Sequence, residues 1–359
     1  MSSAARVTLA DVAAAARVSP ATASRALRGR GDLSTATRER VRRAAAALGY
    51  VRAGETRGRP RGGAGRVIDL VFGTFHDPYT DEVVAGARTT AAALHHDLVL
   101  TTDRPDAEDD WPCRIRSRGT AGVIAGLMTP TAAQVAVLEE ASIPIVLLDP
   151  PSEVRASLPS IRTTDHAGGA AAAEHLVERG AQRFVLIGGA PAYRFGRARV
   201  AGFSAALRRL APTAPLAHVD GDWGAGGAER ACARALRAVG GQGLIGVFAC
   251  NDEMAAGAYR AIAAAGLSVP QDVLVVGFDD VRGARWLHPP LTTVRQPIRE
   301  MGAAAVRILV RAIEGEDVAG EVVELPTALV PRGSTARMPG ATASDAPASS
   351  HPPARTLEA

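Results

Sequence analysis

The chain has 359 residues, of which 47% are hydrophobic, 22% charged and 4% aromatic. This length predicts two or three folding units, and the composition is that of a globular protein rather than a disordered one. No apolar stretch approaches the roughly 18 residues that cross a bilayer, and the N-terminus lacks the pattern of a secretory signal, so we expect a cytoplasmic protein with no membrane contact.

Charge is divided unevenly along the chain. The formal net charge is +4, but residues 1–66 hold 14 Arg against four acidic residues, a net of +10, which leaves −6 for the remainder. A basic segment beside an acidic body is typical of a protein that places one end on a polyanion, and we expect this polyanion to be nucleic acid. The alternative is a basic disordered tail. Cys113, Cys232 and Cys250 are widely spaced, and we expect three small buried residues rather than a disulfide or zinc site.

Residues 7–49 have the pattern of three short helices. The first carries apolar residues at helical spacing over 9–16, and the second opens at Ser19, a good N-cap, followed by Pro20 at the first helical position. Because so few residues separate these two helices, they must cross steeply, as in a helix-turn-helix. A third helix is expected over 34–49. Its predicted apolar face consists of Val41, Ala44, Ala45 and Leu48.

The remaining chain divides by composition. Residues 51–66 are rich in Gly, Arg and Pro, which predicts a flexible basic linker after a helix-turn-helix domain of residues 1–50. In 67–335 short apolar runs alternate with helical segments, which is typical of βαβ units on parallel sheets. The region is longer than one sheet comfortably holds, so the expected fold class is α/β, with two similar lobes facing across a cleft. Residues 336–359 predict a disordered tail.

The sequence pattern predicts the bounds of the strands and helices in the α/β region. The strands are 67–72, 98–101, 122–125, 145–148, 184–187, 216–219, 244–249 and 273–276, and the helices are 79–95, 131–141, 166–179, 197–210, 224–239 and 252–265.

The second N-terminal helix presents its first turns where helix-turn-helix proteins meet base edges in the major groove. Arg25 is the candidate base reader because its guanidinium can bond both O6 and N7 of guanine, and Ala21 is small enough to contact a thymine methyl group. The hydroxyl groups of Thr22 and Ser24 suit phosphate contacts. The alternative is that Arg25 and Arg28 form only a solvated helix face. The DNA-binding prediction comprises Thr8, Ser19, Pro20, Ala21, Thr22, Ser24, Arg25 and Arg28.

A ligand site is expected at the carboxyl ends of the strands, where two-lobed parallel α/β proteins bind their ligands. The candidates near these ends are Asp77, Tyr79, Asp165, Arg199, Trp223, Asn251 and Asp279. Carboxylates and amides accept hydroxyl protons, a guanidinium donates, and an indole stacks on sugar C–H groups, so the set suits a polyol. Alternatives remain open: Asp165 and Asn251 could cap helices, Trp223 could be surface or core, and Arg199 could belong to a structural ion pair.

Several segments resemble one known family. The N-terminal segments are VTLADVA (7–13), VSPATASRAL (18–27), TRERV (37–41) and LGY (48–50), and further blocks follow at 174–176, 199–203, 251–257, 276–280, 290–296 and 330–334. Together they are similar to the lactose-repressor (LacI-type) family of bacterial transcription regulators, over residues 7–335. The resemblance implies a periplasmic-binding-protein-like effector domain and a small effector, often a sugar. It also implies effector contacts at Asp165, Arg199, Trp223, Asn251, Asp279 and Gln296.

The linker departs from the family pattern. Members of the family carry an Ala-x-x-Leu hinge helix whose Leu wedges into the minor groove. Here Gly54, Gly58 and Pro60 oppose a helix. Arg57, Arg59 and Arg61 are expected instead to follow phosphates or to enter a narrow minor groove as an arm.

The sequence therefore predicts a sugar-responsive transcription factor, a repressor that binds a partly palindromic operator as a homodimer. The alternative is a sugar-binding protein of a transporter, which shares the two-lobed body. We expect no enzyme activity, because the G-x-G-x-x-G match at 241–246 precedes a strand instead of following one. No His or Cys spacing suits a metal, and no cofactor is expected.

Overall fold

The computed structural model describes residues 9–27, 34–48, 66–104, 110–152 and 156–336. The chain divides into two compact units, of which the second begins at Arg66. The predicted linker 51–66 and tail 336–359 lie, apart from their residues 66 and 336, outside the described residues. Their boundaries remain predictions.

The first unit is a bundle of three helices, α1 (Leu9–Ala15), α2 (Pro20–Leu27) and α3 (Thr35–Ala47). As predicted, Ser19 caps α2: its Oγ accepts a hydrogen bond from the backbone N–H of Thr22 at 3.1 Å. The small core is formed by Val12, Ala13, Ala16, Ala23, Ala26, Val41 and Ala45. Leu48 was expected in this core but is 37% exposed, because it follows the last turn of α3.

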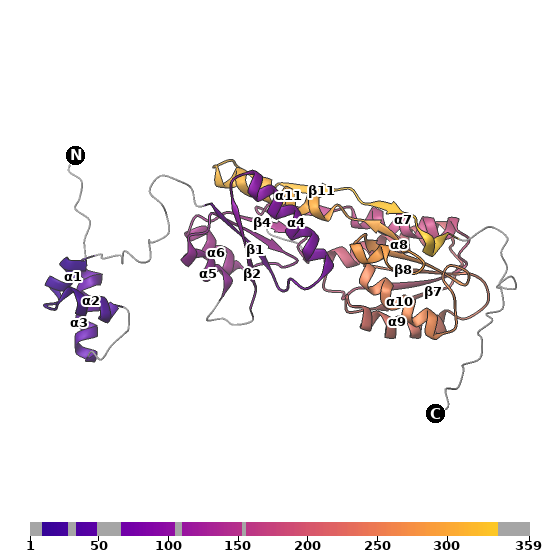
Figure 1. Ribbon diagram of the computed structural model, residues 1–359, viewed down its shortest axis with the longest axis horizontal. Helices are drawn as coiled ribbons and strands as arrows, with labels where there is room; N and C mark the ends of the chain where they lie inside the picture. The colour runs from indigo at the N-terminus through magenta and orange to yellow at the C-terminus, as the bar shows by residue number, and fades with distance from the viewer. Residues whose placement is uncertain (1–8, 28–33, 49–65, 105–109, 153–155, 337–359) are drawn as a thin grey trace, which may run out of the picture. The chain divides into compact units, whose positions relative to one another are not determined.

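The second unit has two lobes, each built on a six-stranded sheet (Figure 1). In the first lobe every strand pair is parallel, in the order β11 (Val322–Leu325), β5 (Ser160–Thr163), β4 (Ile145–Leu148), β3 (Gly122–Gly126), β1 (Val67–Phe72) and β2 (Asp97–Thr102). One face packs against α4 (Pro78–Ala93) and α11 (Ile298–Ile313), and the other against α5 (Trp111–Arg118) and α6 (Ala132–Glu140).

The second lobe repeats this plan. Its sheet has the order β12 (Ala328–Val330), β10 (Thr292–Arg295), β9 (Val273–Asp279), β8 (Ile245–Ala249), β6 (Arg183–Gly188) and β7 (Leu216–Asp220), and only β12 runs antiparallel to its neighbour. The paired helices α7 (Asp165–Glu178) and α8 (Arg194–Leu210) cover one face, and α9 (Ala225–Val239) and α10 (Asp252–Ala264) cover the other (Figure 1). The predicted two-lobed α/β architecture is confirmed.

The chain crosses between the lobes three times, after β5, after β10 and after β11. Hydrogen bonds join the crossing segments side by side. The Thr163 Oγ1–H donates to Gln296 Oε1 at 2.7 Å, and the backbone N–H of Thr327 donates to Thr164 Oγ1 at 2.8 Å. These bonds hold the three connections together, so any change in the angle between the lobes must occur at this point.

Close helix contact fixes α8 in the second lobe. An added Cβ at Gly169 of α7 would overlap the carbonyl oxygen of Arg199, and one at Gly202 of α8 would overlap that of His166. Only glycine lets the two backbones approach this closely. The contact places Arg199 on a rigid pair of helices.

The cysteine prediction is wrong at one position. Cys232 and Cys250 are buried, whereas Cys113 is exposed. On α5 the buried residues are Trp111, Pro112 and Ile115. Cys113 lies on the opposite side of the helix from this buried face, so its side chain points toward solvent.

Candidate functional site

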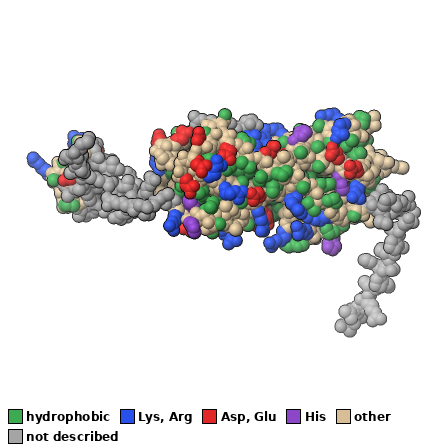
Figure 2. All heavy atoms as spheres, turned by 90° about the horizontal axis from the view of Figure 1, so that it is seen from above, with side chains coloured by type: hydrophobic (Ala, Val, Ile, Leu, Met, Phe, Trp, Pro, Cys, Tyr) green, Lys and Arg blue, Asp and Glu red, His purple; other side chains and the backbone are tan. Residues whose placement is uncertain are grey.

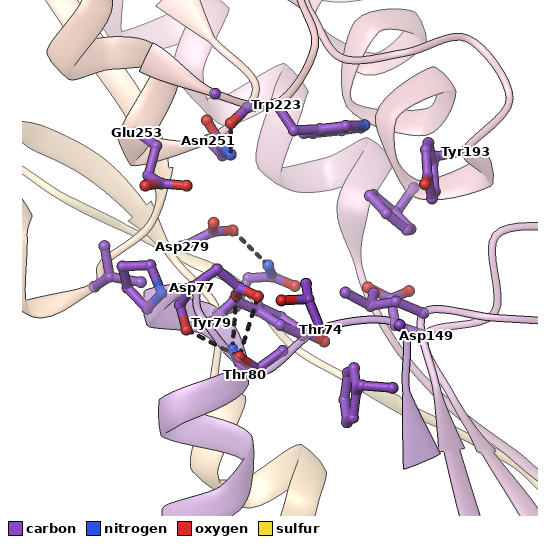
Figure 3. A pocket seen from close by; sticks show the side chains of 18 of the residues that line it. Thr74, Asp77, Tyr79, Thr80, Asp149, Tyr193, Trp223, Asn251, Glu253 and Asp279 are labelled. Atoms are coloured by element: carbon purple, nitrogen blue, oxygen red, sulfur yellow. Dashed lines mark hydrogen bonds between the residues drawn. The ribbon is translucent and has the colours of Figure 1, made fainter. Parts of the chain in front are cut away.

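A cavity of about 400 Å³ lies between the two lobes of the second unit (Figure 3). Its walls come from segments at the carboxyl ends of β1, β4, β8 and β9 and from the helices that follow. Seven of the eight predicted effector residues line it, namely Asp77, Tyr79, Arg199, Trp223, Asn251, Asp279 and Gln296. Asp165 does not line the cavity. Its carboxylate lies behind Arg199 and accepts a hydrogen bond from that residue's Nε at 2.9 Å.

Arg199 is the cation at the base of the cavity. Its Nη1 donates to the backbone oxygen of Cys250 at 2.7 Å and lies 3.5 Å from Asp279 Oδ1, while the guanidinium carbon lies 3.8 Å from the ring centre of Phe278. Burial alone would lower its pKa, but the carboxylates of Asp165 and Asp279 raise the pKa above its ordinary value. Arg199 therefore stays charged, and the structural ion pair considered from the sequence is present as part of the cavity wall.

Asp279 reaches the cavity through a strained backbone. Its φ is +111°, in a region that costs a non-glycine residue about 1–3 kcal/mol. Its Oδ1 accepts a hydrogen bond from Gln296 Nε2 at 2.6 Å, and Gln296 in turn is bonded to Thr163 at the lobe crossing. Burial raises the pKa of Asp279 to about 6, against the lowering effect of Arg199. A ligand that binds Asp279 is thus linked to the connection between the lobes through a single side chain, that of Gln296.

Asp149 is a lining residue that the sequence analysis missed. It follows β4 in the first lobe, and Arg194 Nη2, at the start of α8 in the second lobe, donates to its Oδ1 at 2.9 Å. The backbone N–H of Arg194 also donates to the oxygen of Pro151 at 2.6 Å. Burial and the nearby Asp165 raise the pKa of Asp149 to about 7. This ion pair ties the two lobes together at one end of the cavity.

An aromatic wall closes the second-lobe side. The Trp223 ring centre lies 5.7 Å from that of Tyr193 and 5.2 Å from that of Phe195. An added Cβ at Gly189 would overlap the indole, so the ring packs directly on the backbone. Trp223 is half-buried, and its carbonyl oxygen accepts a hydrogen bond from Asn251 Nδ2 at 3.0 Å. A flat apolar surface is thereby fixed in place, as a sugar ring requires.

The two capping alternatives have different outcomes. Asn251 does cap α10, because its Oδ1 accepts a hydrogen bond from the Met254 N–H at 2.7 Å while the side chain also lines the cavity. Asp165 does not cap α7; it is the first residue of the helix, and its carboxylate turns to Arg199.

The first lobe contributes Asp77 and Tyr79. Asp77 is the N-cap of α4, since its Oδ1 accepts a hydrogen bond from the Thr80 N–H at 2.9 Å (Figure 3). Burial, together with Asp149 and Asp279, raises the pKa of Tyr79 well above its ordinary value, so its hydroxyl stays protonated, and it donates to Met301 Sδ at 4.0 Å while the residue lines the cavity.

The sequence analysis also did not predict several other residues that line the cavity. Among them are Thr74, Tyr193, Phe195, Asp222 and Glu253. Asp149 and Thr74 follow strands, so the rule used for Asp77 could have found them. Tyr193 and Phe195 could not be found in this way, because the predicted helix began at residue 197 whereas α8 begins at Arg194.

The predicted DNA-binding residues are described only in part. Thr8 and Arg28 lie outside the described residues, as do the side chains of Ala21, Ser24 and Arg25 on α2. Ser19, Pro20 and Thr22 lie at the start of α2, where Ser19 and Pro20 are exposed. Base and phosphate contacts therefore remain predictions.

Neither a metal-binding cluster nor a membrane-spanning helix is present among the described residues. Within the ranges given above, no group of three or more His, Cys, Asp or Glu side chains is placed to hold a metal ion. None of the described helices is long and apolar enough to cross a membrane.

Comparison with known families matches both units. Residues 8–53 match the bacterial regulatory proteins of the lacI family, and residues 173–335 match a periplasmic binding protein-like domain. Among solved structures, the chain is similar to the transcriptional regulator CelR in complex with cellobiose, with a TM-score of 0.68, 30% identity and coverage of 92% of this chain and 100% of that one. It is also similar to the lac repressor dimer bound to operator and an anti-inducer, with a TM-score of 0.66, 29% identity and coverage of 92% and 99%.

Curated relatives agree with these structures. The chain is 35% identical to the transcriptional regulator MalR of Streptomyces coelicolor, over 92% of this chain and 97% of that protein. It is 30% identical to the ribose operon repressor of Halalkalibacterium halodurans, over 91% and 97%. Because the similarity extends over nearly the full length of both chains in each pair, the protein belongs to the lacI family of bacterial transcriptional regulators.

Proposed function

We propose that this protein is a sugar-responsive repressor that binds a partly palindromic operator as a homodimer and acts in the cytoplasm, where the chromosome lies. The observation that carries the proposal is the cavity between the lobes, where polyol-binding groups of both lobes face one another on a chain that begins with a helix-turn-helix unit. The ribose operon repressor and the CelR–cellobiose complex support a sugar as the effector.

The cavity supports a mechanism in which ligand binding and lobe angle are coupled. A ligand that contacts Asp77 in the first lobe and Trp223 and Asp279 in the second binds best at one separation of the lobes. By linkage, such a ligand shifts the equilibrium toward the lobe arrangement that it prefers, and DNA affinity changes by the ratio of its affinities for the two arrangements.

A binding role fits the chain better than catalysis or transport. The relatives are transcriptional regulators rather than enzymes. A transporter's solute-binding protein would share the two-lobed unit but would have no use for the lacI-type helix-turn-helix at residues 8–53.

The test has a DNA arm and an effector arm. Purified protein is used to select genomic fragments, and the affinity for the selected operator is measured with and without sugars. A thermal-shift screen finds the sugar, because a ligand at 100 times its Kd adds about 2.7 kcal/mol to the folded state. Asp279→Asn should retain operator affinity and lose the sugar response, while Asp81→Asn, an exposed acid outside the cavity, should keep both. Equal affinity for all fragments and random duplex, with and without sugars, would contradict the proposal.

A further inference from the structure

The cavity is lined by acidic groups in excess. Five carboxylates and one guanidinium face it: Asp77, Asp149, Asp222, Glu253, Asp279 and Arg199. This lining contrasts with the outer surface, where acidic and basic side chains are interspersed over the face that Figure 2 shows. Within the described residues, Asp77, Asp222 and Glu253 form no ion pair with an Arg or His. These three residues are called the acidic rim below.

The nearby cations are already paired. Arg199 bonds Asp165 at 2.9 Å and lies 3.5 Å from Asp279, and its Nη1 also donates to a backbone oxygen. Arg194 bonds Asp149 at 2.9 Å and does not line the cavity. A phosphate or carboxylate on a ligand would have to compete with buried carboxylates for either guanidinium, so these arginines do not offset the acidic rim.

Helix N-termini are a second source of positive charge. The helices α4, α8, α9 and α10 begin at the cavity, and each N-terminus carries a partial charge of about +0.5. Two of these ends are occupied by the rim itself. Asp77 accepts from the Thr80 N–H at 2.9 Å, and Asp222 accepts from the Gly224 N–H at 3.1 Å. Asp149 is paired with Arg194, so the formal excess of the remaining four carboxylates over Arg199 is three, which the four partial charges, about +2 together, do not offset. The cavity therefore stays negative.

Two rim carboxylates belong to opposite lobes. In Figure 3, Glu253 lies on the second-lobe side and Asp77 on the first-lobe side, with Asp279 between them. Burial and the charge of Asp77 raise the pKa of Glu253. The repulsion between these carboxylates would be relieved by a cation placed between the lobes and increased by an anion.

We propose that, if the effector is a sugar as argued above, the acidic rim selects it by charge: neutral and amine-bearing saccharides are admitted, and phosphorylated or carboxylate-bearing ones are rejected. Placing like charges together costs several kcal/mol at a desolvated site, and less here because Asp222 and Glu253 are exposed to solvent. A sugar phosphate should therefore bind at least about tenfold more weakly than its parent sugar, and an amino sugar more tightly than the parent. Salt should reduce both differences, because it screens the partly exposed rim.

The first test needs no knowledge of the effector. All three tryptophans lie in the second unit: Trp111 is fully buried, Trp223 lines the cavity and Trp286 is 71% exposed. In full-length Trp286→Phe protein, fluorescence quenching therefore reports on Trp223. The quenching constants of cationic caesium and anionic iodide are compared at equal ionic strength. The caesium-to-iodide ratio should be severalfold higher for Trp223 than for free N-acetyltryptophanamide. Iodide quenching as effective as caesium would overturn the proposal.

Rim variants provide the matched comparison. Asp77→Asn, Asp222→Asn and Glu253→Gln together remove three charges and keep the shapes. The amide oxygen introduced by Asp77→Asn still caps α4, and that introduced by Asp222→Asn still accepts from the Gly224 N–H. This triple variant should lose the caesium preference. The control removes three exposed acids of the first lobe that do not line the cavity, by Asp81→Asn, Asp97→Asn and Glu140→Gln, and should retain the preference. Loss of the preference in both variants would mean that net charge, not the rim, is responsible.

The second test uses matched ligands. Binding of glucose, glucosamine, glucose 6-phosphate, cellobiose and the corresponding glucosamine disaccharide is measured by thermal shift and calorimetry in the wild type and the triple rim variant. The expected order is amine, then hydroxyl, then phosphate, and it should collapse in the variant. A wild type that prefers the phosphate refutes selection by charge. If Trp223 quenching shows the caesium preference but no saccharide of any charge binds, charge selection stands and the sugar effector is wrong.

Discussion

Removal of the Arg199 charge should destabilise the second unit more than any change at its surface. Arg199→Met keeps most of the side-chain length but leaves Asp165 and Asp279 without the cation that both contact. Arg199 and Asp165 are almost fully buried, so screening by solvent is small. Breaking a buried pair by removing one partner costs about 3–5 kcal/mol, and we expect a loss of this size at pH 7.

The pH dependence distinguishes this cause from lost packing. Without Arg199, the pKa of Asp279 rises further, so the folded protein binds a proton that the unfolded chain does not. The stability penalty is present above the folded-state pKa of Asp279 and is relieved as pH falls through it. The variant should thus regain stability relative to the wild type between pH 7 and pH 5, and Asp165→Asn added to Arg199→Met should recover part of the loss at pH 7.

The assay is urea unfolding followed by tryptophan fluorescence, which reports only the second unit because all three tryptophans lie there. A loss below about 1 kcal/mol, the size expected of an exposed ion pair, or an equal loss at pH 7 and pH 5, would show that Arg199 does not hold the buried carboxylates.

Three further outcomes are expected. The free energy of unfolding of the wild type should fall by about 1.4 kcal/mol from pH 6 to pH 8, because Asp149 loses its proton in this range. Asp149→Asn should flatten this pH dependence, and an equal slope in both proteins would exclude Asp149 as the source of the slope. Gly189→Ala should displace the Trp223 indole and weaken sugar binding in calorimetry, whereas Gly283→Ala, where an added Cβ meets nothing within 4 Å, should not. Arg25→Ala should relax operator selection at one base pair by about 1–3 kcal/mol in a binding-site selection; uniform weakening on all sequences would assign Arg25 to phosphate.

The regular alternation of the α/β region was predictable because each strand and helix there carries its own periodic signal. Strand β4, for example, has the predicted bounds 145–148, and Thr131 caps α6 where a helix was expected to begin. Asp77, Arg199 and Asn251 line the cavity because parallel strands bring their carboxyl ends to one edge.

The sequence analysis missed helices α5 and α11, although the 16 residues of α11 carry a local helical pattern of apolar residues. The other omissions depend on contacts between distant segments. Strands β5 and β11 have only four residues each, and β11 pairs with β5 across more than 150 residues of chain, so no local pattern indicates it. The Asp149–Arg194 ion pair joins the two lobes and exists only once they are assembled. Asp165 followed a strand, as the rule requires, but a carboxylate in the first turn of α7 faces the neighbouring helix rather than the ligand space.

The threefold crossing between the lobes has a consequence for synthesis. The core of the second lobe draws on residues between Ala172 and Val294, an unbroken stretch, whereas the core of the first lobe combines residues before 162 with others up to Val318. The core of the first lobe, whose strands β1 to β5 leave the ribosome first, is therefore completed after the core of the second lobe. At about 5–20 residues per second, the first-lobe sheet waits roughly 8 to 30 s for the helix that covers it, and during that interval an exposed apolar face is the part of the nascent chain most in need of a chaperone.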